Sequence, residues 1–348
     1  MPTYPELQCA ISTLETQKEL YKPTPFWRDA SKRIANEIEA HGIENFRRLP
    51  LALSYFVPTY GPPTLGLNLE QAKWLESTFQ EKYQNSYKAE LALTAYLSGK
   101  INALADFRVL MAANKDADAF GLTTFSESDV GNPIEQFDFD GRRYSRSALN
   151  YLLGLSLLKR YADLSKIKTV LEIGGGFGTL GEIIGKAPTK GIRYIDIDIP
   201  PTNFVADYYL RTCFGSQRVL SGVDPRGTDP ILINSLPDIS VMCSWQLEYL
   251  VGEVDLFVNF ISFQEMEPEV VENYITHVKR LNPKWLILRN MKEGKQRGTV
   301  YASGVLNPIT TDDYVNMLSD YNLVAMETHP FGYQTVDGFH SELLIFRG

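Results

Sequence analysis

Residues 170–181 read VLEIGGGFGTLG, and this stretch decides the fold that we expect for the chain. Its first four residues suit a buried strand, and one of them, Glu172, brings a charge into that strand. Three glycines follow at every second position: Gly174, Gly176 and Gly178. Glycine lets a chain turn with positive φ and lets a ligand approach the backbone without meeting a Cβ atom. The stretch therefore predicts a strand that ends in a ligand-binding turn.

The spacing Glu-x-Gly-x-Gly-x-Gly from Glu172 resembles motif I of class I methyltransferases that use S-adenosylmethionine (SAM). Residues 176–181 also match G-x-G-x-x-G, so a dinucleotide is an alternative ligand, and a glycine turn without a ligand is another. A dinucleotide presents a pyrophosphate to a helix N-terminus. SAM has no phosphate and instead carries an ammonium, a carboxylate and a sulfonium, so the carboxylate of Glu172 suits this cationic ligand better than a dianionic one. We therefore expect SAM as the cofactor.

Composition and charge narrow the classes of protein. The chain has 348 residues, of which 44% are hydrophobic and 22% charged, as in ordinary globular proteins. Its net charge of −8 argues against a broad nucleic-acid-binding surface. Three widely spaced cysteines give neither a zinc pattern nor a disulfide framework, and no Asp, Glu and His set has metal-ligand spacing. We expect no metal.

The sequence also bears on location and partners. No apolar run approaches the roughly 20 residues that span a bilayer. The first residues lack the basic start and apolar block of a signal peptide. We therefore expect a cytoplasmic protein whose partner is a small-molecule acceptor, without nucleic acid or membrane, and we leave a homo-oligomer open.

Three segments follow from the patterning along the chain. Residues 1–120 read as mostly helical and are expected to form a lid that selects the substrate. Residues 121–146 show little periodicity and many turn formers, which indicates a linker loop. Residues 147–348 begin with an apolar helix and then alternate strands and helices, so they are expected to form the SAM-binding methyltransferase domain.

The fold class expected from this alternation is α/β, with a Rossmann-like parallel sheet. The segment HPFGYQTVDG between the last two strand candidates is short enough for a hairpin, so the final strand should run antiparallel. A seven-stranded sheet that ends in such a hairpin is the class I methyltransferase arrangement. The strand candidates are 169–173, 192–197, 239–244, 254–261, 284–289, 322–328 and 339–346.

Cofactor ligands are expected where strands end, because ligands of open α/β sheets lie outside the carboxyl ends of the strands. Asp198 follows the second strand and is the expected ribose ligand, with Asp196 as the second choice. Past the third strand, the backbone near Ser244 could meet the adenine and Trp245 could offer an aromatic face, although Trp245 also suits a core. The expected cofactor-binding residues are Glu172, Gly174, Gly176, Gly178, Asp198, Ser244, Trp245 and Asn259.

Methyl transfer from a sulfonium is an in-line displacement that requires alignment of the acceptor and exclusion of water. A hydroxyl acceptor also benefits from a general base, for which Glu265, His340 and His329 are the candidates in that order. Polar residues after apolar strands, and in the 121–146 segment, are costly to bury without partners. The expected substrate-binding residues are Gln264, Glu127, Asn132 and Asn290, although residues of the linker would equally suit a solvated loop.

Several segments together resemble a family of sugar O-methyltransferases: LEIGGGFGTLGE, IDIP with the following YYL, SWQLEYL and VDLFVNFISFQEM. The resemblance covers roughly residues 125–348. It implies that Glu172, Gly174, Gly176 and Asp198 bind SAM, that Gln264 and Glu265 line the acceptor pocket, and that the acceptor is a hydroxyl of a sugar, sugar nucleotide or glycosylated metabolite. The alternatives are methylation of a non-sugar metabolite at O, N or C, and a SAM-binding scaffold without catalysis.

Overall fold

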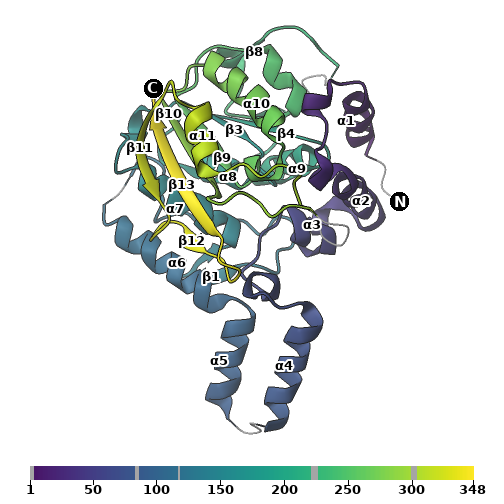
Figure 1. The fold of residues 1–348 in the computed structure, drawn as a ribbon, viewed down its shortest axis with the longest axis vertical. Helices are drawn as coiled ribbons and strands as arrows, with labels where there is room; N and C mark the ends of the chain where they lie inside the picture. The colour runs from purple at the N-terminus through teal and green to yellow at the C-terminus, as the bar shows by residue number, and fades with distance from the viewer. Residues whose placement is uncertain (1–3, 83–85, 117, 221–225, 299–303) are drawn as a thin grey trace.

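A mixed β-sheet with helices on both faces forms the body of the protein (Figure 1). The computed structural model describes residues 4–82, 86–116, 118–220, 226–298 and 304–348. Within them the main sheet has nine strands in the order β11-β13-β10-β9-β3-β4-β7-β5, with β12 paired to β13. Its strands are β3 (Thr169–Ile173), β4 (Arg193–Asp198), β5 (Val219–Leu220), β7 (Ile239–Cys243), β9 (Leu256–Phe260), β10 (Trp285–Met291), β11 (Asn322–Glu327), β12 (Tyr333–Gln334) and β13 (His340–Arg347).

The described residues also hold helices α1 (Pro5–Glu15), α2 (Pro25–His41), α3 (Pro50–Tyr55), α4 (Leu69–Lys82), α5 (Tyr87–Leu97), α6 (Lys100–Ala113), α7 (Arg146–Leu158), α8 (Thr179–Lys186), α9 (Thr202–Phe214), α10 (Pro268–Arg280) and α11 (Thr311–Met317). Short 3-10 turns are η1 (Glu19–Tyr21), η2 (Ile43–Arg48), η3 (Pro62–Leu65), η4 (Leu164–Lys166), η5 (Ile233–Ser235), η6 (Ser244–Tyr249) and η7 (Phe263–Glu265). A small parallel pair joins β6 (Ile231–Leu232) to β8 (Leu250–Val251). The expected α/β class with a mixed sheet and helices is confirmed.

Strand direction follows the pattern of connections. Strands β10, β9, β3, β4, β7 and β5 run parallel, while β13 runs antiparallel between β10 and β11. The sheet is larger than expected, because the short strands β5 and β12 join the seven predicted segments. The connection from the carboxyl end of β3 runs to β4 on one side, whereas the connection from the neighbouring β9 runs to β10 on the other side. Such a reversal opens a crevice for a ligand.

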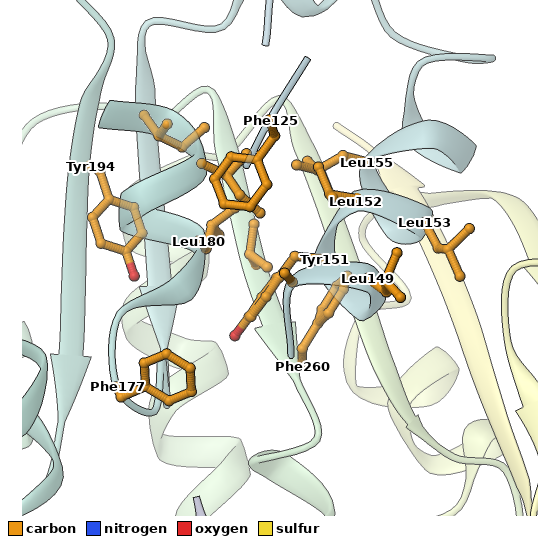
Figure 2. Close-up of a cluster of buried hydrophobic side chains, with 14 of the residues drawn as sticks. Phe125, Leu149, Tyr151, Leu152, Leu153, Leu155, Phe177, Leu180, Tyr194 and Phe260 are labelled. Atoms are coloured by element: carbon orange, nitrogen blue, oxygen red, sulfur yellow. The ribbon is translucent and has the colours of Figure 1, made fainter. Parts of the chain in front are cut away.

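Each face of the sheet buries its own apolar cluster, because successive side chains of a strand point to opposite faces. In β3, Val170 packs with the cluster of α7, α8 and α9, whereas Leu171 and Ile173 pack with the cluster of α10 and α11. Figure 2 shows part of the first cluster, in which Tyr151 of α7 lies beside Phe260 of β9. Their rings are stacked 4.8 Å apart. The packing fixes α7 across the crevice end of the sheet.

The N-terminal helices form the other wall of this crevice. Helix α2 starts at Pro25 and ends before its C-cap Gly42, which adopts φ +82°. Helices α4 and α5 project from the body as a separate pair, as the lower part of Figure 1 shows. This pair lies within residues 1–120, which were expected to be mostly helical. No described residue of α5 is buried, so α5 contributes little to the core.

The segment 121–146 differs from the expected loop, because it contains a short hairpin of β1 (Phe137–Phe139) and β2 (Arg142–Tyr144). Asp140 and Gly141 connect these strands with φ values of +54° and +72°. An Asp-Gly pair with positive φ at both positions is the usual signal for a two-residue hairpin turn. The signal was present in FDFDGRRY, but the polar turn formers around it hid the two short strands. Across the described ranges, no helix is both long and apolar enough to cross a membrane.

Candidate ligand-binding cavity

A cavity of about 130 Å³ lies at the carboxyl ends of the parallel strands. It is lined by the turns that follow β3, β4, β7 and β9, and by residues of α2, α3, α7 and α10. This place is the crevice that the reversal around β3 creates. The cavity therefore lies where ligands of open α/β sheets bind, outside the carboxyl ends of the strands.

The glycine turn after β3 forms one wall. Gly174 and Gly176 line the cavity with φ values of +78° and +62°, whereas Gly178 lies at the start of α8, outside the lining. A Cβ atom on Gly174 would come within 2.1 Å of the Ser262 hydroxyl, so the turn and the loop after β9 touch as closely as glycine allows. The backbone N–H of Gly174 donates to the Ile197 carbonyl at 2.8 Å.

Two carboxylates at the end of β4 hold the same turn. The N–H of Gly175 donates to Asp196 Oδ1 and that of Gly176 to Asp198 Oδ2, each at 3.2 Å. Asp198 Oδ1 also accepts the N–H of Ile199 at 2.7 Å. An ionised carboxylate has about four acceptor positions, so Asp198, which lines the cavity, keeps about two for a ligand. Asp196 is fully buried and does not line the cavity.

Glu172 lies behind the glycine turn rather than in the cavity lining. It is fully buried, and its two oxygens accept the hydroxyls of Tyr151 at 2.7 Å and Tyr194 at 2.5 Å. A carboxylate held by two buried donors is positioned rather than free to contact a ligand. Its charge nevertheless adds to the negative field at this wall, because Asp198 is close enough to raise its pKa.

Burial changes the proton affinities of this acidic group. It raises the pKa of Glu172 to about 7, and the charge of Asp198 adds to that effect while the two tyrosines oppose it. Burial likewise raises the pKa of Asp198 to about 7, opposed by the N–H groups of Ile199 and Gly176. The pKa of Asp196 rises well above its ordinary value, first through burial and then through its two acidic neighbours. A cation entering the cavity would favour the ionised forms.

Glu265 is the second acidic residue of the cavity lining. Its Oε2 accepts the Trp27 indole N–H at 3.0 Å and its Oε1 lies 2.5 Å from the Lys295 ammonium. The Thr24 hydroxyl donates to the Glu265 carbonyl at 2.9 Å. Helix α2 and the residue before it therefore fix Glu265 at the cavity, although they are about 240 residues away in the sequence.

Aromatic side chains complete this wall. Trp27, Tyr55 and Phe56 line the cavity, and Trp27 packs against Tyr55 with ring centroids 5.7 Å apart. The sequence analysis missed these residues, because an amphipathic helix pattern does not show which face covers a distant sheet edge. On the sheet side, Ile261 lines the cavity with φ +72°, a strained conformation for a β-branched residue.

The loop after β7 contributes Ser244 but not Trp245. Ser244 lines the cavity, and its hydroxyl donates to the Tyr21 carbonyl at 3.1 Å. Trp245 is 2% exposed and belongs to the apolar cluster on the α10 face of the sheet. The structure thus places Trp245 in the core, which was the other interpretation of its aromatic side chain, rather than in the cavity lining.

Three predicted ligand-contacting residues instead bond to each other behind the cavity wall. The Asn290 amide donates to Asn259 Oδ1 at 3.1 Å, and Asn290 Oδ1 accepts the N–H of Gln264 at 3.2 Å. Gln264 Oε1 accepts the Met291 N–H at 2.7 Å. None of the three lines the cavity. Their buried polar groups are thus satisfied by hydrogen bonds within the set and to the neighbouring backbone. The Asn259 amide also donates a hydrogen bond to the Ser262 hydroxyl.

The two predicted histidines lie away from the cavity. His340 Nδ1 is 2.5 Å from Glu293 Oε1, and its backbone N–H donates to the same carboxylate. His329 is exposed at the end of the β11 segment. Neither lines the cavity, because β13 and β11 are the outer strands on one side of the sheet. Glu265 alone of the three base candidates lines it.

The two predicted linker ligands join the linker to the N-terminal helices. Glu127 is fully buried, accepts the N–H and hydroxyl of Ser145, and lies 3.1 Å from the Arg47 guanidinium. Arg47 also pairs with Glu135 at 2.5 Å. The Asn132 amide donates to Asn45 Oδ1 at 2.8 Å. Both side chains are occupied in fixing the segment to residues 44–47, outside the cavity.

The charge of the cavity is one-sided. Among the described residues that line it, Asp198 and Glu265 are acidic and none is Lys, Arg or His. Glu265 is already paired with Lys295, which does not line the cavity, so Asp198 is the carboxylate that would repel the anionic groups of a dinucleotide and attract a ligand with positive charge. In the described parts of the chain no set of three His, Cys, Asp or Glu residues is arranged to hold a metal ion.

No known protein-family model matches the chain, and no curated protein does. Solved structures give distant similarities. One is magnesium protoporphyrin IX methyltransferase (ChlM) from Synechocystis PCC 6803 with bound SAH, at 13% identity and TM-score 0.38 over 58% of this chain and 83% of that one. A second is mitomycin 7-O-methyltransferase MmcR, at 10% identity and TM-score 0.35 over 97% of this chain and 76% of that one.

A third is a SAM-dependent methyltransferase from Aquifex aeolicus, at 14% identity and TM-score 0.34 over 55% of this chain and 88% of that one. These three neighbours are methyltransferases.

Proposed function

We propose that the chain is a SAM-dependent methyltransferase that methylates a hydroxyl group. The observation that carries this proposal is the acidic cavity without a lining cation at the glycine turn. SAM carries an ammonium, a sulfonium and a carboxylate and is positive overall, so an acidic wall favours it over a dinucleotide, whose pyrophosphate is a dianion. The strand order, with an antiparallel strand inserted beside the edge, also agrees with the class I arrangement that the sequence resemblance implies.

The residues present fit SAM in distinct roles. Asp198 would accept the ribose hydroxyls with its remaining acceptor positions. Gly174 and Gly176 would let the ligand lie against the backbone, and Ser244 would lie near the adenine. Glu172 would act through the tyrosines that hold it and through its charge, not by contact. When bound, SAM supplies a methyl group on a sulfonium.

Glu265 is the base that this proposal assigns. It lines the same cavity as the glycine turn and is close enough to Asp198 to raise the pKa of that residue. In the transfer, a bond forms between the acceptor oxygen and the methyl carbon, the carbon–sulfur bond breaks, and the acceptor proton passes to the Glu265 carboxylate. Trp27 and Lys295 hold that carboxylate in one orientation, which aligns it for the proton.

For the acceptor we propose a polyhydroxy compound of the sugar class. Trp27 and Tyr55 present aromatic faces beside the Glu265 carboxylate, and a sugar ring offers apolar C–H groups together with hydroxyl donors. Residues 1–120 would act as the lid that excludes water, since α2 and α3 supply this wall. An ionisable group at the proposed acceptor position also disfavours a scaffold without catalysis.

The test is incubation of the purified chain with methyl-labelled SAM and two acceptor panels, sugar nucleotides and sugars in one, aromatic and aliphatic alcohols in the other. Mass spectrometry should detect a labelled methyl group on an oxygen of a sugar acceptor. A labelled non-sugar product would reject the sugar class while retaining methyl transfer. Glu265→Gln should remove turnover, and Glu269→Gln, an exposed residue of α10, is the matched control that should retain it.

A further inference from the structure

A second cavity of about 350 Å³ lies between α1 and α2, and none of its lining residues lines the cavity at the strand ends. We name it the α1–α2 cleft; it is lined by Ile11, Leu14, Lys22, Arg28, Ser31 and Lys32, together with Glu15, Glu19, Pro23 and Pro200. Its lining combines apolar side chains with charged and polar ones, as the sites of small molecules do.

One part of the cleft is apolar. Ile11 and Leu14 come from α1, and Pro23 and Pro200 close the cleft from two other segments. Leu14 is 8% exposed, so it contributes to the floor rather than to the open surface. A hydrocarbon chain of several methylene groups would find apolar contacts here and would gain free energy on leaving water.

The other part carries positive charge. Arg28 and Lys32 are four residues apart on α2 and therefore lie on one face of the helix. Lys22 is paired with Glu19 at 2.7 Å, but in the described parts of the chain neither Arg28 nor Lys32 forms an ion pair. Three cations thus face two carboxylates, Glu15 and Glu19, and the two unpaired cations lie together on α2.

Ser31 is the second, independent sign of a ligand. It is 7% exposed, it lines the cleft, and among the described residues its hydroxyl has no hydrogen-bond partner. A buried hydroxyl without a partner is costly, and a serine in a helix usually relieves that cost through the carbonyl one turn before it. An acceptor atom entering the cleft between Arg28 and Lys32 would give this hydroxyl its partner.

We propose that the α1–α2 cleft binds a small organic anion, with its anionic head group at Arg28, Ser31 and Lys32 and its apolar body against Ile11 and Leu14. The proposal is independent of methyl transfer, because it requires no residue of the cavity at the strand ends. The site also adjoins the segment that holds Glu265, since Thr24 and Trp27 lie between Pro23 and Arg28 in the chain.

The test is isothermal titration of the full chain with octyl phosphate, kept below the concentration at which it forms micelles. We expect saturable binding of one molecule per chain, and clearly weaker binding of 1-octanol, which lacks the charge, and of inorganic phosphate, which lacks the chain. The absence of saturable binding would overturn the proposal. Equal binding of octanol would also overturn it, and so would equal binding of phosphate.

Variants of α2 test whether the charges of Arg28 and Lys32 are needed for binding. Arg28→Gln combined with Lys32→Gln should weaken octyl phosphate binding about fivefold, as expected for two partly exposed charge contacts. Arg33→Gln, which removes an exposed charge of α2 outside the cleft, should leave binding unchanged. Equal affinities of the double variant and the native chain would contradict the proposed head-group site.

Ser31→Ala should change the melting temperature and the affinity for octyl phosphate in different directions. Without ligand, the variant should melt at or above the temperature of the native chain, because it loses a buried hydroxyl that has no partner. With octyl phosphate, its affinity should fall, because the head group loses a donor. A lower melting temperature with unchanged affinity would show that Ser31 has a structural role and would reject it as a ligand-binding residue.

Discussion

Because the buried carboxyl of Asp198 lies beside the glycine turn, we predict that SAM binds more tightly as the pH rises toward neutrality. Burial raises the pKa of Asp198 to about 7 in the unliganded chain. The positive charges of SAM would lower that pKa in the complex, because a nearby cation favours the ionised carboxyl. SAM binding should therefore release a proton near pH 6, and by linkage its affinity should increase with pH.

The magnitude follows from the ionised fraction of the free carboxyl. With a pKa of about 7, that fraction is about 9% at pH 6.0 and about 76% at pH 7.5, so the affinity should rise about eightfold over this interval. This ratio corresponds to about 1.2 kcal/mol of binding free energy. The assay is isothermal titration with SAM at both pH values, in two buffers whose ionisation enthalpies differ, so that the proton release is measured directly.

Two variants show whether Asp198 is the source. Asp198→Asn has nearly the same shape but cannot ionise, so its SAM affinity should be low and should lose most of the pH dependence. Asp320→Asn, which removes an exposed acid outside the cavity, should keep the native slope. A native affinity that is flat or falls between pH 6.0 and 7.5 would refute this reasoning, as would an unchanged slope in Asp198→Asn.

The remaining predictions concern the turn, the base and the linker. Gly174→Ala should lower the free energy of unfolding by at least about 2 kcal/mol in urea titrations, because the residue adopts φ +78° and its Cβ would meet Ser262. The control is Gly191→Ala, where φ is +75° but the space is open, so that only the conformational cost of about 1–2 kcal/mol should be lost. Glu265→Gln should lower kcat far more than SAM affinity in paired rate and titration measurements, and a normal rate would reject it as the base. Arg47→Met should cost about 3–5 kcal/mol by thermal or urea unfolding, because Glu127 and Glu135 would stay buried without their cation, whereas exposed Arg33→Met should change little.

Local sequence patterns predicted the sheet better than the helical region. VLEIGGGFGTLG forms the expected strand and turn, because apolar runs and glycines act within a few residues of each other. The Asp140-Gly141 hairpin carried the same kind of local signal, but it was overlooked inside a polar segment.

The cavity wall formed by α2 and α3 could not be predicted in the same way. Trp27 contacts Glu265 through a hydrogen bond across 238 residues, and no periodicity within α2 specifies that contact. The amphipathic pattern shows that one face is covered, but it does not show what covers it.

The polar residues at the strand ends show a second limit. The cost of burying Asn259, Gln264 and Asn290 correctly indicated that they have partners. Those partners are one another and the neighbouring backbone, not the lining of the cavity. Asp198 also follows a strand, but unlike Asn259, Gln264 and Asn290 it lines the cavity. The local sequence does not show which of these polar side chains reaches the cavity.

Binding of SAM to the purified chain tests the central claim most directly. We predict that isothermal titration shows one saturable site for SAM, that Asp198→Ala weakens it markedly, and that NAD does not compete for it even in large excess. Saturable NAD binding with no measurable SAM binding would contradict the account, because the acidic cavity without a lining cation would then hold a pyrophosphate.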